Sequence, residues 1–158
     1  MNRVDLILNG IPQPPRQPSL KKNAVSFVRK VLKILGKKNW DISVLFCDNA
    51  YIKTLNHKFR KKNSATDVLS FPLGETIEDG KGRQRFLPGD IIVSLESMEA
   101  NAASFGVSSD EELKRLLIHG ILHLDGMDHF TNKKSEPMLI LQENILSSLI
   151  GEEILCAG

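Results

Sequence analysis

The segment SSDEELKRLLIHGILHLDGMDH, residues 108–129, is the most informative stretch of this sequence. It predicts a helix, because Ser108 with Glu111, or Ser109 with Glu112, can form a capping box. The acidic first turn also complements the helix dipole. The second half of the segment is apolar on nearly every side, which indicates a helix buried at the centre of the fold.

Three of the four histidines of the chain lie in this segment. Residues four apart share one face of a helix, so His119 and His123 can bind the same metal ion. His129 cannot come from the same straight helix, and Gly126 stands where the chain must turn back, because glycine adopts positive φ without a steric penalty. Three neutral imidazoles suit one Zn²⁺ per chain and leave the fourth coordination position open for water. Three unrelated histidines are the alternative, but buried histidines need partners, and we therefore predict a metal site.

The spacing of the histidines equals that of one class of zinc protease, H-E-x-x-H-x-x-G-x-x-H. In such a protease the glutamate after the first histidine is the general base, and here this position is Gly120. The segment therefore supplies metal ligands without the protease base. Of its two other carboxylates, we expect Asp128 to orient a histidine and Asp125 to be a solvated turn residue.

The remainder of the chain predicts four strands and four further helices. The strands cover residues 3–9, 41–47, 67–72 and 90–95, and the helices cover residues 20–35, about 48–60, about 96–105 and about 136–150. Ser19 and Asp48 are the expected N-caps of the first two helices. Prolines keep residues 10–18 irregular, and the polar, glycine-rich residues 74–88 are expected to form a long surface loop. These elements predict an α+β fold in one domain, residues 1–158, with a small mixed β-sheet and about five helices.

Charge is distributed unevenly along a chain whose formal net charge is +2. Residues 1–66 hold 14 basic and 3 acidic residues, whereas the remaining 92 hold 7 basic and 16 acidic residues. A polyanion partner and ordinary solvated helix faces both explain such a split, and charge alone favours the solvated faces. No apolar run approaches the roughly 20 residues that span a bilayer, and no secretory signal is present. The two cysteines, Cys47 in the expected core and Cys156 in the tail, form no disulfide framework, which suits a reducing cytoplasm.

Three blocks of the sequence together resemble the YbeY family. HGILHLDGMDH, residues 119–129, matches the family signature H-G-x-L-H-L-x-G-x-D-H. LNHKFRKKNSATDVLSFP, residues 55–72, resembles its L-N-x-x-x-R and T-D-V-L-S-F-P segments, and GDIIVS, residues 89–94, resembles its G-D-I-x-I-S strand, with Val93 at the fifth position. The blocks stand in the family order, and the resemblance spans most of the chain.

This resemblance implies a zincin-like α+β fold and a metal-dependent, single-strand-specific endoribonuclease. Family members act in maturation of the 3′ end of 16S ribosomal RNA and in ribosome quality control. By resemblance the metal ligands are His119, His123 and His129, and the functional arginine is Arg60. The implied partners are ribosomal RNA and the small ribosomal subunit, with no DNA and no membrane.

The residues also suggest how such a site would act on RNA. An open zinc site lowers the pKa of bound water to about 7 and polarises a phosphoryl oxygen. Attack by this water and attack by the 2′-hydroxyl of the RNA are both open. The phosphodiester gains negative charge in the transition state, and the planar fork of Arg60 suits that phosphate. Lys61 and Lys62 are expected to complement the end of a helix or to contact phosphate loosely.

Five side chains near this arginine in the sequence could line the same cleft. His57 lies one turn away, but we expect it to be exposed. Phe59 and Phe71 could stack on bases, although core packing is the expected role. Asp67 and Ser70 could hold the arginine or line the groove, and ending the loop before a strand is the alternative for Asp67.

Two other functions remain open from the residues alone. A zinc metallopeptidase is favoured by the histidine spacing and opposed by Gly120. A non-enzymatic, zinc-containing ribosome-associated factor is favoured by the basic first half of the chain.

Overall fold

The computed structural model describes residues 1–11 and 18–155. Its elements are, in order, β1 (Arg3–Leu8), α1 (Leu20–Ile34), β2 (Asp41–Cys47), α2 (Asn49–Arg60), β3 (Val68–Glu78), β4 (Gln84–Ser94), α3 (Leu95–Phe105), α4 (Ser109–Leu124) and α5 (Pro137–Ser148). The predicted α+β class is confirmed, with a four-stranded sheet and five helices in this part of the chain. Most of the proline-rich segment 10–18 and Cys156 lie outside the described residues.

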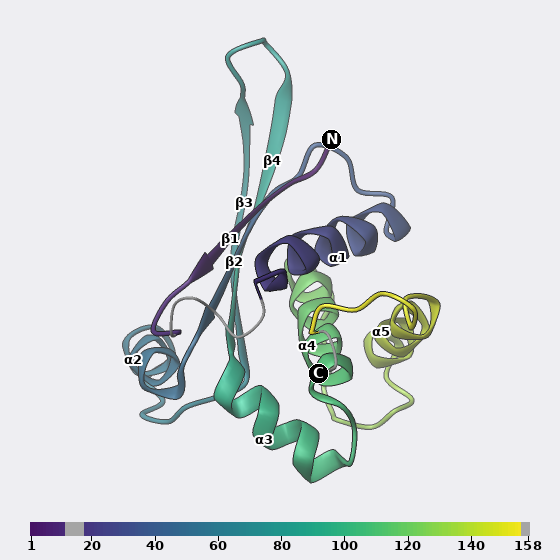
Figure 1. The fold of residues 1–158 in the computed structure, drawn as a ribbon. Helices are drawn as coiled ribbons and strands as arrows, with labels where there is room; N and C mark the ends of the chain where they lie inside the picture. The colour runs from purple at the N-terminus through teal and green to yellow at the C-terminus, as the bar shows by residue number, and fades with distance from the viewer. Residues whose placement is uncertain (12–17, 156–158) are drawn as a thin grey trace.

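The sheet is mixed and has the strand order β1-β2-β4-β3. β1, β2 and β4 are parallel, and β3 pairs with β4 in the antiparallel direction. Alternate residues of a strand face opposite sides. Val44 and Phe46 therefore belong to the main core, whereas Leu45 and Cys47 pack with Ile52 of α2 in a smaller cluster. Figure 1 shows α1, α4 and α5 on one side of the sheet and α2 on the other. Burial raises the pKa of the Cys47 thiol to about 12, as expected for a core cysteine.

The prediction that residues 74–88 form a long surface loop is wrong. This segment extends β3 and β4 into a long antiparallel ribbon that projects beyond the remainder of the sheet (Figure 1). Thr76 pairs with Phe86, and the carboxylate of Asp79 in the turn accepts the backbone N–H of Arg83 at 2.9 Å. Most of the ribbon side chains are exposed, so it carries none of the apolar alternation that marks a half-buried strand.

The central helix α4 begins and ends as its sequence predicts. The hydroxyl of Ser108 accepts the backbone N–H of Glu111 at 3.0 Å. At the other end the N–H of Gly126 bonds to the carbonyl of His123, and the N–H of Met127 bonds to the carbonyl of Leu122, both at 3.0 Å. This is the Schellman arrangement, and Gly126 has the positive φ, 89°, that it requires. The chain therefore reverses directly after the second histidine.

The other helices end close to the predicted positions. Asp48 caps α2 by accepting the backbone N–H of Tyr51 at 2.9 Å, and Gly106 ends α3 with a φ of 69°. Ser19 stands at the N-cap of α1, but its side chain makes no capping hydrogen bond. Within the described residues, every helix is too short or too polar to cross a membrane.

Candidate metal centre

The structure brings three histidines together at the end of α4. His119 and His123 project from the same face of the helix, and His129 returns from the loop that follows Gly126. Their potential ligand atoms all lie within 4.8 Å of one another. The Nε2 atoms of His119 and His123 are 3.0 Å apart.

Each of the three imidazoles has an acceptor for a proton on Nδ1. These acceptors are the side-chain oxygen of Gln142 for His119 (2.6 Å), the carbonyl of Met127 for His123 (3.0 Å) and the carbonyl of Thr131 for His129 (2.8 Å). A carbonyl oxygen can only accept, so each bond places the proton on Nδ1 and leaves the lone pair on Nε2. The three rings are therefore set in the tautomer that binds a metal through Nε2.

This donor set fits a zinc-type ion. Two unprotonated nitrogens 3.0 Å apart cannot hydrogen-bond to each other, and their lone pairs repel unless a cation lies between them. Tetrahedral zinc with Zn–N distances of 2.0–2.1 Å separates its nitrogens by about 3.3 Å, which is close to this spacing. Burial also lowers the pKa of His119 and of His123, which favours the neutral imidazole that a metal ion requires.

The acceptor for His119 is a residue that the sequence analysis missed. Gln142 is buried in α5, and its amide donates to Glu143 at 3.1 Å. The Glu143 carboxylate in turn accepts two hydrogen bonds from Arg115 of α4, each of 3.0 Å. A chain of hydrogen bonds through Arg115, Glu143 and Gln142 therefore fixes the orientation of His119. The sequence does hold a signal for this role, because Gln142 is a polar residue on an otherwise apolar, buried face of the helix.

Gly120 is required by the packing of α4 on the sheet. A Cβ atom at this position would lie 2.8 Å from Cγ2 of Ile91 in β4, well inside contact distance. A glutamate side chain therefore has no room where the zinc proteases carry their general base. This geometry argues against the metallopeptidase alternative.

Arg60 lies at the same cleft as the histidine pair. It ends α2, and its Nη2 donates to the carbonyl of Ser70 at 2.9 Å, while its guanidinium carbon lies 5.8 Å from the ring centre of Phe71. Together with His119 and His123 it lines a cleft of about 410 Å³. The side chain is anchored on one side and exposed on the other, so N–H groups remain available for a ligand.

The neighbours of Arg60 in α2 do not all behave as predicted. His57 is exposed, as expected, and lines a different surface hollow beside Lys53 and Lys58. The core position expected for Phe59 is wrong, because 57% of this residue is exposed. It packs edge-on against the half-buried Phe71, with ring centres 5.4 Å apart. The single helix α2 covers only part of its sheet face, which leaves this ring at the edge.

Asp67 does not contact the arginine. One of its oxygens accepts the backbone N–H of Val68 at 2.7 Å, and the other accepts the amide of Asn101 at 2.9 Å. This carboxylate therefore joins β3 to α3. Ser70 instead holds Arg60 through its carbonyl, and it also lines the cleft.

The two aspartates of the histidine segment have separate roles. Asp128 accepts the backbone N–H of His129 at 2.8 Å, so it fixes the backbone of this histidine rather than its ring. Asp125 is not merely solvated, because it pairs with Nζ of Lys37 at 2.6 Å. This ion pair joins the end of α4 to the segment that follows α1.

Comparison with known proteins identifies the family. A family model described as Endoribonuclease YbeY matches residues 13–150. The chain belongs to the YbeY endoribonuclease family. A YbeY relative from Treponema denticola is 46% identical over 153 residues, which cover 97% of both chains. The YbeY relative from Borreliella burgdorferi is 49% identical over 127 residues, or 76% of this chain and 81% of the relative.

A solved structure extends the comparison from sequence to fold. The solution structure of a Thermotoga maritima protein is 33% identical to the chain. The two structures superpose with a TM-score of 0.58, and the match covers 96% of this chain and 91% of the Thermotoga chain. The likeness to this solved structure therefore extends to the overall arrangement of sheet and helices.

Proposed function

We propose that this protein is a metal-dependent endoribonuclease that cleaves single-stranded RNA at the histidine cleft. In this proposal His119, His123 and His129 hold one Zn²⁺, and Arg60 is the catalytic residue. The supporting observation is that the ligand atoms of these three histidines lie within 4.8 Å of one another, and that two of the histidines line a cleft of about 410 Å³ together with Arg60, in a chain of the YbeY endoribonuclease family.

In this proposal the metal, Arg60 and the acceptors behind the imidazoles have separate roles in catalysis. A bound metal supplies Lewis acidity and lowers the pKa of a water molecule. Arg60, held by the carbonyl of Ser70, directs its free N–H groups at the non-bridging oxygens of the scissile phosphate. It thereby stabilises the negative charge that develops in the transition state. The acceptors behind the imidazoles keep their orientation fixed throughout the reaction.

The proposed substrate is the single-stranded 3′ end of 16S ribosomal RNA. The protein would act on the small ribosomal subunit in the cytoplasm and serve in ribosome quality control, with residues 1–158 as one endoribonuclease domain. Membership of the YbeY family and the basic first half of the chain support this assignment.

One assay separates this function from its two rivals. The purified protein is incubated with single-stranded RNA and with casein, each with and without a chelator. We expect RNA cleavage that the chelator abolishes and added zinc restores, with casein left intact. Casein cleavage would favour a metallopeptidase. If neither RNA nor casein were cleaved, a ribosome-associated factor without enzymatic activity would be favoured.

The role of Arg60 has its own test. Arg60→Ala should lower single-turnover RNA cleavage by roughly 10²-fold, the scale of losing one partner of the transition-state charge. Zinc content and melting temperature should stay at wild-type values, because the side chain is exposed and is no metal ligand. Arg60→Lys should restore only part of the rate, since it keeps the charge without the fork. Wild-type cleavage by Arg60→Ala would remove this residue from the active site.

A further inference from the structure

The exposed side of α1, which we call its outer face, is a strongly basic surface outside the histidine cleft. It carries Lys21, Lys22, Arg29, Lys30 and Lys33. The helix has 15 residues, of which five are basic and none is acidic. Its opposite face is buried against the core through Leu20, Ala24, Phe27, Val28, Val31 and Leu32. The apolar face therefore anchors the helix, and the basic residues have no part in that packing.

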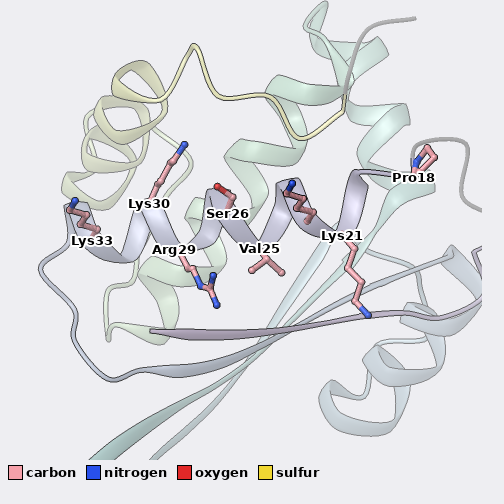
Figure 2. Close-up of a pocket in the computed structure, with 8 residues that line it drawn as sticks. Pro18, Lys21, Val25, Ser26, Arg29, Lys30 and Lys33 are labelled. Atoms are coloured by element: carbon pink, nitrogen blue, oxygen red, sulfur yellow. The ribbon is translucent and has the colours of Figure 1, made fainter. Parts of the chain in front are cut away.

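The basic side chains surround a shallow hollow of about 690 Å³ along the helix. Figure 2 shows Lys21, Val25 and Arg29 on the side of α1 that faces β1, and Lys30 and Lys33 elsewhere around the helix. The distance from Lys21 to Lys33 along the helix axis is about 18 Å, from a rise of 1.5 Å per residue. This surface is long enough to contact several phosphates of one strand.

The charges of this face are mostly uncompensated. Lys30 pairs with Glu152 at 2.5 Å, and within residues 1–11 and 18–155 the other four basic side chains of α1 form no ion pair. Arg29 and Lys33 stand four residues apart, a spacing at which like charges destabilise a helix. Acidic residues at such positions would stabilise a helix face that is only solvated. On a surface that binds a polyanion, they would weaken the binding.

The end of α1 meets the end of α4 that carries the histidines. Lys37, in the turn that follows α1, pairs with Asp125 at 2.6 Å. Asp125 directly precedes Gly126, and Gly126 lines the histidine cleft. The basic face therefore leads along α1 to the neighbourhood of the cleft.

We propose that the outer face of α1 binds the phosphodiester backbone of RNA as a second contact site, beyond the scissile phosphate in the cleft. Lys21, Lys22, Arg29 and Lys33 form this site, and recognition there is independent of base sequence because only phosphates are contacted. The inference rests on the proposed function for the identity of its ligand. Its test separates the two.

The test compares two triple variants that each lose three positive charges. The first variant combines Lys21→Gln, Arg29→Gln and Lys33→Gln. The control combines Arg3→Gln, Lys81→Gln and Arg83→Gln, which lie at the start of β1 and at the tip of the β3–β4 ribbon. Glutamine has nearly the helix propensity of lysine and arginine, so α1 should remain folded, and melting temperatures check this.

Binding of a fluorescent single-stranded RNA of about 20 nucleotides to the metal-loaded protein is measured by anisotropy as salt is varied. Each phosphate contact contributes about 0.7 to the slope of log affinity against log salt, so the α1 variant should lower the magnitude of this slope by about 2. As salt is lowered from 1 M to 0.1 M, the wild type should therefore gain about 100-fold more affinity than the α1 variant. The control should keep a slope close to that of the wild type.

Cleavage of an RNA of about 6 nucleotides provides the second readout, because this RNA is too short to occupy both sites. The α1 variant should cleave it at the wild-type rate. An unchanged salt slope in the α1 variant, or an equal change in the control, would overturn the inference while leaving the proposed function intact. An α1-dependent slope without any cleavage would uphold the inference and refute the proposed function. Loss of binding to anionic lipid vesicles with full retention of RNA affinity would assign this face to a membrane and overturn the inference.

Discussion

Gln142 provides the sharpest test of how the fold prepares the proposed metal centre. Its side-chain oxygen lies 2.6 Å from Nδ1 of His119 and fixes the proton on that nitrogen. Gln142→Leu fills the same space and removes the acceptor. His119 would then favour a proton on Nε2, which points at Nε2 of His123 only 3.0 Å away and forms a hydrogen bond there. A metal would have to break this bond and displace the proton.

The expected effect is therefore on metal affinity more than on folding. Loss of a residue that orients a metal ligand lowers affinity by about 10–100-fold, or about 1.4–2.7 kcal/mol. The metal-free protein should keep nearly its original melting temperature, because replacing a buried polar group by an apolar one of similar shape is close to neutral when its partner finds another bond. Competition against a chromophoric chelator measures the affinity, and thermal unfolding of the chelated protein measures the stability.

Gln142→Glu is the matched control. A carboxylate still accepts the Nδ1 proton and makes the imidazole a stronger ligand, so zinc affinity should equal or exceed that of the wild type. If Gln142→Leu bound zinc as tightly as the wild type, the fixed tautomer would play no part in metal binding. If both variants lost affinity equally, the role of this residue would be steric.

Three further predictions follow from the packing and the pKa values. Gly120→Ala places a methyl group 2.8 Å from Ile91 and should destabilise the protein by about 1–3 kcal/mol in urea unfolding; unchanged stability would show that α4 does not lie this close to the sheet. Gly126→Val strains a residue whose φ is 89°, at a cost of about 1–3 kcal/mol, and should weaken zinc binding measured by chelator competition, whereas equal affinity would show that the turn does not need glycine. Burial lowers the pKa values of His119 and His123, so the unfolded chain binds more protons and the stability of the metal-free protein should fall as the pH drops from about 6.5 through the lowered pKa values. A melting temperature that rises on acidification over this range would contradict that assignment.

The features that local sequence determines were predictable. Helix ends depend on residues within one turn, so Asp48 and Ser108 mark the starts of their helices correctly. The proximity of the three histidines follows from the helical repeat together with the reversal at Gly126. The mixed sheet followed from the order and the apolar character of its strands.

The features that depend on distant packing were not predictable. Most residues of the β3–β4 ribbon are exposed, so its sequence resembles a polar loop. The exposure of Phe59 depends on how much of the sheet α2 covers. Gln142 meets His119 across 23 residues of sequence, and no local pattern connects them. The pairing of Asp125 with Lys37 likewise joins segments far apart in the chain.

Titration of zinc into the metal-free protein tests whether RNA cleavage depends on a metal bound by the three histidines, with bound metal and single-turnover cleavage of single-stranded RNA measured in the same sample. We expect cleavage to be absent without metal, to rise in proportion to bound zinc and to saturate at about one equivalent. A variant with both His119→Ala and His123→Ala should neither bind zinc nor cleave. Cleavage by the metal-free protein, or undiminished cleavage by this double variant, would contradict a metal-dependent endoribonuclease built on the histidine cleft.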